Sequence, residues 1–219
     1  MRTAVVFVGG PHRHAPDAGA HPGLVGRRAD RVVAVDSGLH LARSHGWQVD
    51  VVVGDMDSVD PVELSDAAAH GVAVQRHPVD KDATDLELAL ELLLDDGVGA
   101  VEVIAADAGR MDHLVGGLLT LCAPRFAPLG LRAWLGSTLV VPVHDRVRID
   151  AAVGQIVSLL PVHGPALGVR TEGLRWPLRG ERLEPGTSRG VSNEMVAGVA
   201  EVSLDEGCLA VVVPQEEQS

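Results

Sequence analysis

The chain contains few aromatic residues, two cysteines and no tyrosine. Among its 219 residues there are three Trp and two Phe, although hydrophobic residues make up 46% of the total. The hydrophobic core is therefore predicted to consist mainly of Val, Leu and Ala. Cys122 and Cys208 each lack a second cysteine or a histidine at metal-ligand spacing. We expect both to be buried thiols rather than ligands of a metal centre.

Positive charge is also scarce, and long apolar runs are absent. The chain has 18 Lys and Arg against 30 Asp and Glu, a formal net charge of -12. Because phosphate neutralisation needs an excess of basic residues, we expect no nucleic-acid partner. No apolar run approaches the roughly 20 residues that span a bilayer, and the N-terminal apolar stretch is too short for a signal peptide. The sequence therefore favours a cytoplasmic protein without a membrane segment.

The N-terminal part alternates short β-branched runs with helical patterns. Strands are expected at 4–8, 32–35, 51–53, 72–74 and 101–105, and helices at 38–45, 61–70, 85–94 and 114–121. Asp60 and Thr84 are predicted N-caps, each followed three residues later by Glu, and Gly71 is a predicted helix stop. Strands alternating with helices indicate an α/β domain, 1–137, with a doubly wound, mostly parallel sheet.

The pattern changes beyond about Leu135. Short apolar runs separated by turn signals predict strands at 139–143, 156–161, 168–171, 197–203 and 208–213. No sustained helical period is present there. A second domain, 138–219, is therefore predicted to be an antiparallel β-sandwich.

Carboxylates follow four successive strands of the predicted parallel sheet. These residues are Asp36, then Asp55 and Asp57, then Asp80, Asp82 and Asp85, and finally Asp107 and Asp112. One Asp after a strand is usually a turn former or a helix cap. In open parallel sheets, however, ligands bind beyond the carboxyl ends of the strands. So many like charges on one rim would repel each other unless a cation joined them, which predicts a divalent-metal site.

The residue types around this rim suit Mg²⁺ and phosphate. Mg²⁺ prefers oxygen ligands, usually carboxylates together with substrate phosphates, and Asp55 and Asp57 would project the same way from an extended segment. The helix opening near Thr84 offers free N–H groups to phosphate, while Lys81 and Arg110 suit phosphoryl oxygens. The sequence contains neither a P-loop motif nor Gly-x-Gly-x-x-Gly.

Six short motifs, taken in order, resemble the thiamine pyrophosphokinase family. They are Val35-Asp36-Ser37-Gly38, Gly54-Asp55-Met56-Asp57-Ser58, residues 80–90, Gly109-Arg110-Met111-Asp112-His113, residues 173–178 and residues 190–194. The resemblance covers about 32–213. It implies an α/β catalytic domain joined to an all-β domain, and a homodimer with shared active sites. It also implies Mg²⁺-dependent transfer of pyrophosphate from ATP to the hydroxyl of thiamine, with release of AMP.

The resemblance further implies roles for individual residues. Mg²⁺ would be held by Asp55, Asp57 and Asp82, with Asp36 on the same rim. The nucleotide and its phosphates would meet Thr84, Asp85, Lys81 and Arg110, and thiamine would meet Asp112, Trp176, Ser192 and Asn193. The hydroxyl proton would pass to Asp85 or Asp112, between which the sequence does not decide. Trp176 would cover the thiazolium cation or stack on the pyrimidine of thiamine, or else it is a core residue of the sandwich.

Some positions depart from the family pattern, and other functions stay open. Ala108 stands where a second Gly is common, Gly116 and Gly117 stand where Asn is frequent, and 11–28 matches no known motif. One alternative is a pyrophosphokinase of similar fold acting on a pterin alcohol. Another is a non-catalytic sensor of thiamine or nucleotide. A structural α/β protein with a solvated acidic face would leave the concentration of Asp unexplained.

Overall fold

A computed structural model describes residues 1–10, 24, 26–80, 82–105 and 110–215. Two compact units make up the chain. The first comprises Met1–Leu114 and Pro128–Gly136, and the second Val115–Ala127 and Ser137–Ser219. The domain limits expected from the sequence, 1–137 and 138–219, stay a prediction. Lys81, Asp107 and Ala108 lie outside the described residues.

The first unit contains the parallel sheet. Its strands are β1 (Arg2–Val8), β2 (Arg31–Val35), β3 (Val51–Gly54), β4 (Ala73–Arg76), β5 (Val98–Ala105) and β6 (Leu131–Leu135). The helices between them are α1 (Gly38–Ser44), α2 (Pro61–Ala69) and α3 (Asp85–Asp95). After β5 the chain continues through α4 (Met111–Leu121) and the 3₁₀ helix η1 (Pro124–Leu129), and α4 runs from the first unit into the second.

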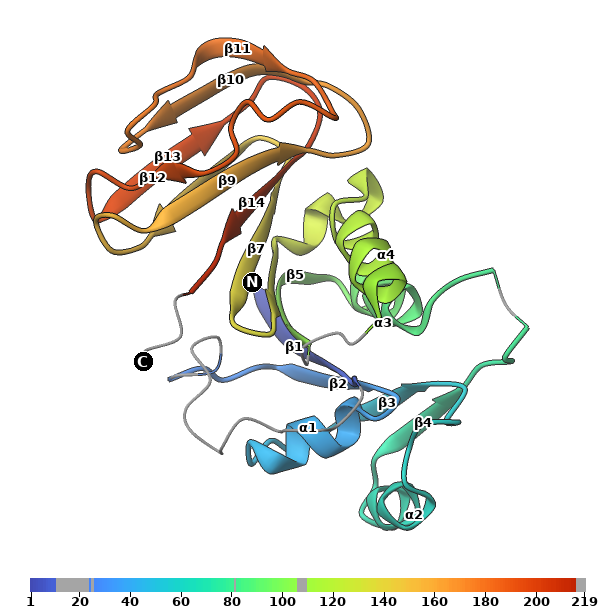
Figure 1. Cartoon of the computed structure of the whole chain (residues 1–219). Coiled ribbons are helices and arrows are strands. Elements are labelled where there is room, and N and C mark those ends of the chain that lie inside the picture. The colour runs from blue at the N-terminus through green and yellow to red at the C-terminus, as the bar shows by residue number, and fades with distance from the viewer. Residues whose placement is uncertain (11–23, 25, 81, 106–109, 216–219) are drawn as a thin grey trace. The chain divides into compact units, whose positions relative to one another are not determined.

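The strand order in this unit is β6-β5-β1-β2-β3-β4, and each neighbouring pair is parallel. Figure 1 shows α1 and α2 on one side of β2 and β3, with α3 on the opposite side. Helices on both faces bury the strands from two sides, and β3 is accordingly buried at all four positions. The predicted doubly wound parallel sheet is therefore confirmed.

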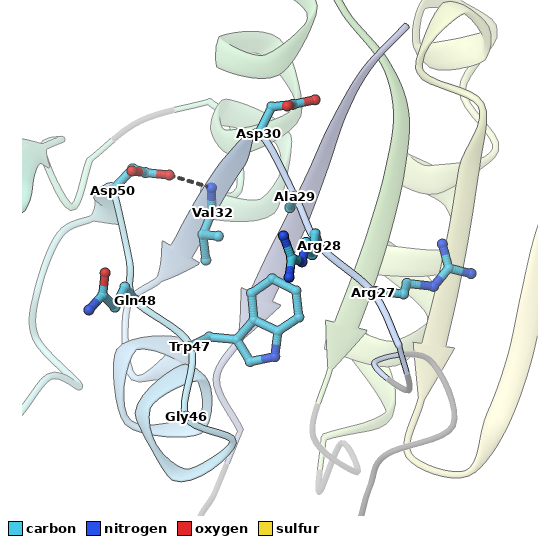
Figure 2. A pocket seen from close by; sticks show the side chains of 9 residues that line it. All are labelled: Arg27, Arg28, Ala29, Asp30, Val32, Gly46, Trp47, Gln48 and Asp50. Carbon is cyan, nitrogen blue, oxygen red and sulfur yellow. Dashed lines mark hydrogen bonds between the residues drawn. The ribbon is translucent and has the colours of Figure 1, made fainter.

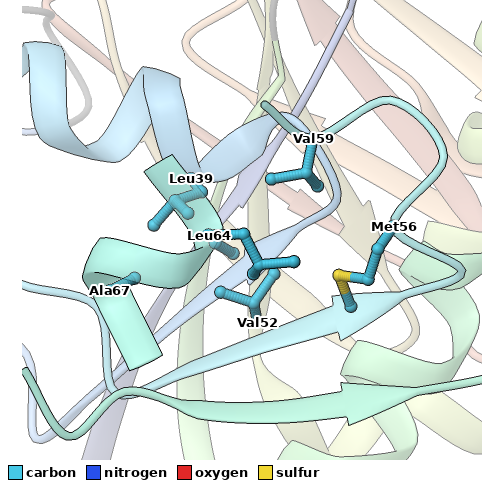
Figure 3. Packing of buried hydrophobic residues seen from close by; sticks show 7 residues of the cluster. Leu39, Val52, Met56, Val59, Leu64 and Ala67 are labelled. Carbon is cyan, nitrogen blue, oxygen red and sulfur yellow. The ribbon is translucent and has the colours of Figure 1, made fainter. Parts of the chain in front are cut away.

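A cluster of aliphatic side chains joins α1 and α2 to the sheet (Figure 3). Leu39 of α1 and Leu64 of α2 pack against Val52 of β3. Met56 also belongs to this cluster and is 8% exposed, although it stands between two aspartates. The acidic segment is thus anchored in the hydrophobic core through its central residue.

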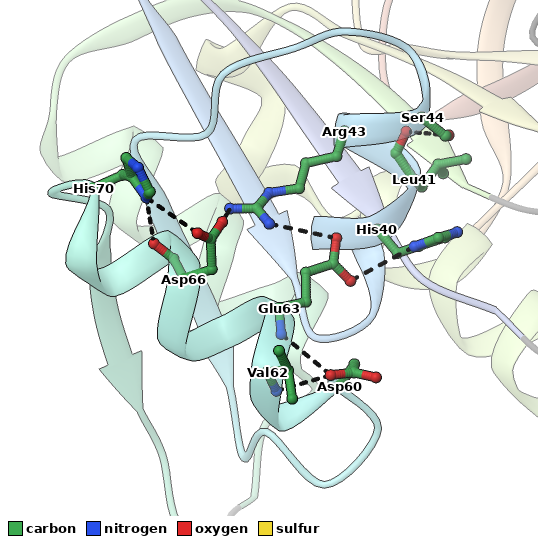
Figure 4. A network of polar contacts seen from close by, with 9 residues as sticks. All are labelled: His40, Leu41, Arg43, Ser44, Asp60, Val62, Glu63, Asp66 and His70. Atoms are coloured by element: carbon green, nitrogen blue, oxygen red, sulfur yellow. Dashed lines mark hydrogen bonds and ion pairs between the residues drawn. The ribbon is translucent and has the colours of Figure 1, made fainter.

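Polar contacts at the surface connect the same two helices (Figure 4). Arg43 of α1 forms ion pairs with Asp66 at 2.9 Å and with Glu63 at 3.9 Å, both on α2. The carboxylate of Asp60 accepts the N–H groups of Val62 and Glu63, as its predicted N-cap role requires. Exposed ion pairs contribute about 0–1 kcal/mol each, so this network orients α1 and α2 more than it stabilises them.

The second unit is built from antiparallel strands. These are β7 (Thr138–Val143), β8 (Arg146–Asp150), β9 (Ile156–Pro161), β10 (Ala166–Glu172), β11 (Arg179–Leu183), β12 (Asn193–Glu194), β13 (Val199–Ser203) and β14 (Leu209–Val213). Within this unit one set runs β12-β9-β14-β7 and the other β11-β10-β13-β8. Apart from the parts of α4 and η1 in Val115–Ala127, this unit has the predicted antiparallel β architecture.

Several elements were not expected from the sequence. In the second unit, β8 and β11 are the two edge strands of their sheet. Their sequences, RVRID and RGERL, carry the charges that protect sheet edges from aggregation, so they lack the apolar runs that reveal inner strands.

In the first unit, β6 is the strand that sequence reasoning missed. Its Trp134 donates a hydrogen bond of 2.7 Å from Nε1 to the buried carboxylate of Glu102 on β5. Arg27 forms a 3.0 Å ion pair with the same carboxylate. Burial raises the pKa of Glu102, and the nearby Arg27 opposes that rise. Glu102 is the only acidic residue among the buried residues of the described chain, and it is paired.

No helix in the described parts of the chain is long and apolar enough to cross a membrane.

Candidate active site

The turn after β2 places Asp36 against the end of β3. Asp36 adopts a left-handed conformation with φ 47°. Its Oδ1 accepts the N–H of Met56 at 3.3 Å, and its own N–H donates to the carbonyl of Val53 at 3.1 Å. Gly54 makes this approach possible, because a Cβ there would lie 1.8 Å from Oδ1 of Asp36. A non-glycine residue in the left-handed region is uncommon, although Asp adopts it more readily than most, and such residues cluster at functional sites.

The acidic segment after β3 forms a tight turn. Asp57 donates its N–H to Oδ1 of Asp55 at 3.0 Å, and Met56 between them has φ 68°. The expectation of an extended segment is therefore wrong. Extended backbone cannot bury Met56 and also fold the N–H of Asp57 back onto Asp55, so the chain takes the left-handed conformation instead.

The carboxylates of this rim affect one another. Burial raises the pKa of Asp36 to about 7, and repulsion from Asp85, Asp55 and Asp57 adds to the rise. Four of the expected acidic residues therefore lie close together, although they follow three successive strands. They are Asp36, Asp55, Asp57 and Asp85. Asp82 is exposed in the loop before α3. Within the described ranges, no group of three His, Cys, Asp or Glu side chains is placed to hold a metal ion.

Asp36→Asn is expected to stabilise the metal-free protein at and above neutral pH. The folded-state pKa lies above the unfolded value, so the stability contribution of Asp36 is complete below pH 4 and is lost as pH rises through about 7. Asn keeps an oxygen for the N–H of Met56 but carries no charge. Because the carboxyl group is partly hydrated, we expect a gain of about 1–2 kcal/mol in the free energy of unfolding at pH 8.

Urea unfolding at pH 5 and pH 8 with a chelator present would measure this gain. The gain should be smaller at pH 5. Asp82→Asn removes an exposed charge from the loop before α3 and should change the free energy of unfolding at neither pH. Equal stability of Asp36→Asn and the wild type at pH 8 would contradict the electrostatic account of Asp36.

The first turn of α3 lies beside the rim. Oγ1 of Thr84 accepts the N–H of Glu87 at 3.2 Å, which confirms the predicted N-cap. Asp85 is the first residue of the helix. The positive end of the helix dipole therefore faces the region in which Asp36 and Asp85 repel each other.

Arg110 and Asp112 form a bidentate ion pair at the start of α4. Nε of Arg110 lies 3.1 Å from Oδ1 of Asp112, and Nη2 lies 2.6 Å from Oδ2. The hydrogen bond from Arg110 lowers the pKa of Asp112 to about 2. A carboxylate that holds a proton so weakly is a poor proton acceptor at neutral pH. To contact a phosphate, Arg110 must either release Asp112 or bind Asp112 and the phosphate together.

The second unit presents Trp176 on its surface. The side chain is 56% exposed, so the alternative that it is a core residue is wrong. Asn193 is 3% exposed and holds the backbone of Trp176 at both ends. Its Oδ1 accepts the N–H of Trp176 at 3.1 Å, and its Nδ2 donates to the carbonyl at 2.8 Å. Asn193 thus positions Trp176 from beneath.

Two charged neighbours of Trp176 were not anticipated. The guanidinium of Arg175 lies 5.2 Å from the centroid of the Trp176 ring and pairs with Glu194 at 2.9 Å. A cationic ligand would therefore need the opposite face of the indole. Ser192, with φ 55°, donates its N–H to Oγ of Ser158 at 3.0 Å. In the sequence, Arg175 directly precedes Trp176 and Glu194 directly follows Asn193. This adjacency could have predicted both charged neighbours.

Comparison with known proteins decides the family. The model described as "Thiamin pyrophosphokinase, catalytic domain" matches residues 24–131, and "Thiamin pyrophosphokinase, vitamin B1 binding domain" matches residues 145–209. The chain belongs to the thiamin pyrophosphokinase family. It is thus an enzyme of the thiamine pyrophosphokinase class with ATP as co-substrate, which confirms the predicted enzyme class. The pterin alternative is not favoured, because the descriptions of both matching models refer to thiamin or vitamin B1.

Individual relatives agree with this assignment to the thiamin pyrophosphokinase family. The thiamine pyrophosphokinase of Bacillus subtilis is 22% identical over 217 residues, which is 97% of this chain and 98% of the relative. Thiamine pyrophosphokinase 1 of Oryza sativa is 26% identical over 168 residues, covering 73% of this chain and 64% of the relative.

Solved structures share the fold. The crystal structure of the Bacillus subtilis thiamine pyrophosphokinase has a TM-score of 0.82 at 22% identity, covering 99% of this chain and all of that one. The enzyme from Candida albicans has a TM-score of 0.77 at 12% identity, covering 98% and 89% of the two chains.

A hollow of about 520 Å³ lies beside the amino-terminal ends of β2 and β3 (Figure 2). Asp30 and Asp50 on its wall precede β2 and β3. The acidic rim instead follows the carboxyl ends of these strands, which is where open parallel sheets bind ligands. We therefore assign the candidate active site to the rim and not to this hollow.

Proposed function

We propose that the chain transfers the diphosphoryl group of ATP to the hydroxyl of thiamine, with Mg²⁺ held at the acidic rim. The observation that carries this proposal is the convergence of Asp36, Asp55, Asp57 and Asp85 at one sheet edge. Their mutual repulsion costs free energy that a divalent cation would relieve. All of these donors are carboxylate oxygens, the type that Mg²⁺ prefers.

Asp55, Asp57 and Asp82 are the proposed metal ligands. Mg²⁺ held by these residues would neutralise charge on the ATP phosphates and so favour displacement at phosphorus. Asp36 contributes charge to the same rim and fixes the turn through the N–H of Met56. Asp82, in its exposed loop, would complete the set when ATP is present.

Cationic and N–H groups around the rim are proposed to orient the phosphates. The first turn of α3 offers backbone N–H groups beside Thr84 and Asp85. Lys81 and Arg110 supply positive charge, and Asp112 holds the guanidinium fork of Arg110 in a fixed plane. Positioning of this kind is the main source of catalysis in phosphoryl transfer.

Asp85 is the proposed acceptor of the hydroxyl proton. The thiamine oxygen attacks the β-phosphorus in line, its proton passes to a carboxylate, and AMP leaves. Of the two candidates, Asp112 is disfavoured because Arg110 lowers its pKa to about 2. Asp85 is the candidate that remains. It lies at the start of α3, close enough to Asp36 to repel its carboxylate.

Trp176, Ser192 and Asn193 are proposed to form the thiamine side of the site. The exposed indole suits a thiazolium cation, and the buried Asn193 holds it in place. A homodimer with active sites shared between subunits, as the family resemblance implies, belongs to the same proposal.

Product analysis tests this function directly. The purified chain, supplied with ATP, Mg²⁺ and thiamine, should yield AMP and thiamine diphosphate in equal amounts, and a chelator should stop the reaction. A pterin alcohol in place of thiamine should give no AMP. AMP formation from the pterin alone would establish the rival enzyme, and tight thiamine binding without AMP would establish a sensor.

Trp176→Ala is expected to raise KM for thiamine about tenfold, because a desolvated cation–π contact contributes about 1–2 kcal/mol. KM for ATP should change less than twofold. Trp47→Ala is the matched control, since Trp47 packs on Phe7 at 5.9 Å in the first unit and lies outside the proposed site. Steady-state kinetics in both substrates measures the difference. An equal rise in both KM values would make Trp176 a packing residue.

A further inference from the structure

Two short segments of the second unit pair beside the indole of the proposed thiamine site. Leu174 and Met195 form an antiparallel bridge between the segments, and their side chains are 4% and 0% exposed. The N–H of Arg175 donates to the carbonyl of Glu194 at 2.9 Å. The N–H of Glu194 donates to Oδ1 of the buried Asn193, also at 2.9 Å. The backbones of Arg175 and Glu194 are therefore fixed beside a buried bridge.

The side chain of Arg175 is held at two points. Its Nη1 lies 2.9 Å from Oε2 of Glu194, and its Cζ lies 5.2 Å from the centroid of the Trp176 ring. The side chains of Arg175 and Glu194 are 57% and 29% exposed. Exposed ion pairs add little to folding stability. The pair consequently matters more for the charge around the indole than for the fold.

Without its carboxylate partner, Arg175 would oppose a cationic substrate. Thiamine carries a permanent positive charge on its thiazolium ring, and the guanidinium already lies over one face of Trp176. Two cations on opposite faces of one indole repel each other and are attracted by the same ring electrons. The carboxylate of Glu194 cancels the charge of Arg175 across one hydrogen bond. The ring thereby stays able to attract a second cation.

We propose that Glu194 is a specificity-determining residue for a cationic substrate, because it neutralises Arg175 beside the ring of Trp176. This role rests on the proposed function, in which Trp176 receives thiamine. Glu194 acts through Arg175 and takes no part in the transfer of the diphosphoryl group. With Glu194 present, the site favours a cationic ring over an uncharged ring of the same shape. Without it, this preference is lost.

A purely structural role of the ion pair predicts a different pattern. If the pair only held the indole in place, loss of either side chain would weaken the binding of every ligand, charged or uncharged. The charge-neutralising role instead predicts opposite effects of the two single substitutions. Glu194→Gln leaves an unpaired cation beside the ring, whereas Arg175→Met leaves an unpaired carboxylate and keeps an apolar side chain.

Equilibrium dialysis of the full-length chain measures this difference. The ligands are thiamine, the uncharged hydroxyethylthiazole half of thiamine, and the N-methylated, cationic form of that half. Glu194→Gln should raise the Kd for both cationic ligands about tenfold, and Arg175→Met should lower it about threefold. The Kd for the uncharged thiazole should change less than about twofold in either variant. The double variant should bind thiamine within about twofold of the wild type, because both charges are gone.

Glu184→Gln is the matched control. It makes the same chemical change in the carboxylate partner of Arg182, within the same unit, and should alter none of the three Kd values. Unchanged thiamine binding by Glu194→Gln would overturn the proposal, and so would weaker binding of all three ligands to both single variants. If Glu194→Gln does not fold, Arg175→Met decides, since weaker thiamine binding by that variant contradicts the charge-neutralising role.

AMP release separates this role from the proposed function. If the variants show the expected Kd values but the wild type forms no AMP from ATP and thiamine, the role of Glu194 stands and the proposed reaction is wrong. If the wild type forms AMP but the Kd values do not follow the charges, the reaction stands and the role of Glu194 is wrong. A wild type that binds no thiamine would contradict both.

Discussion

Asp57→Asn is expected to lower kcat for thiamine diphosphate formation by about 10²–10³-fold while the protein stays folded. Asp57 lies in an exposed turn after β3, and its hydrogen bond to Asp55 uses the backbone N–H, which the substitution leaves intact. The change removes one negative charge from the proposed magnesium site. The loss should be partly recovered at high Mg²⁺ if the residue acts through the metal.

Asp60→Asn is the matched control for this variant. It makes the same chemical change three residues later, at an N-cap position where Asn serves as well as Asp. AMP release over a range of Mg²⁺ concentrations, together with thermal melting, compares the two. If both variants keep the wild-type kcat at every Mg²⁺ concentration, Asp57 is not a metal ligand.

Gly54→Ala is expected to lower the free energy of unfolding by about 2–4 kcal/mol and to abolish most activity. The new Cβ would lie 1.8 Å from Oδ1 of Asp36, so the carboxylate must leave its hydrogen bond to Met56. Gly54 also has φ 149°, which an alanine adopts with strain. Both effects act on the turn that carries the acidic rim.

Gly71→Ala separates steric displacement from backbone strain. Gly71 has φ 89°, but a Cβ there would meet nothing within 4 Å. The Gly71→Ala substitution should lower the free energy of unfolding by about 1 kcal/mol and leave kcat unchanged. Urea unfolding and the AMP assay measure both quantities. Equal losses in the two variants would show that contact with Asp36 is not what Gly54 protects.

Apart from β6, the order of strands and helices in the first unit could be predicted because local signals and the global fold agree there. Asp60 and Thr84 are N-caps as expected, and Gly71 ends α2 with a positive φ. Such signals depend on residues a few positions apart. The expectation that successive Asp residues meet at one edge followed from the general rule that the carboxyl ends of parallel strands share an edge.

The remaining features depend on residues that are distant in the sequence. Asp36 and Met56 meet only after β2 and β3 pair, and the left-handed turn follows from burying Met56. The exposed position of Trp176 depends on Asn193, seventeen residues further on. No local spacing contains such information.

The burial of Met56 has a consequence for how mutations would be tolerated. The side chain shares its packing with Leu39 and Leu64, so the acidic turn has the same rigidity as the core beneath it. Substitutions that loosen α1 or α2 would widen the range of positions open to the turn and weaken the proposed binding of Mg²⁺ before the chain unfolds. In this fold, selection for catalysis and selection for a well-packed interior would therefore act on the same residues.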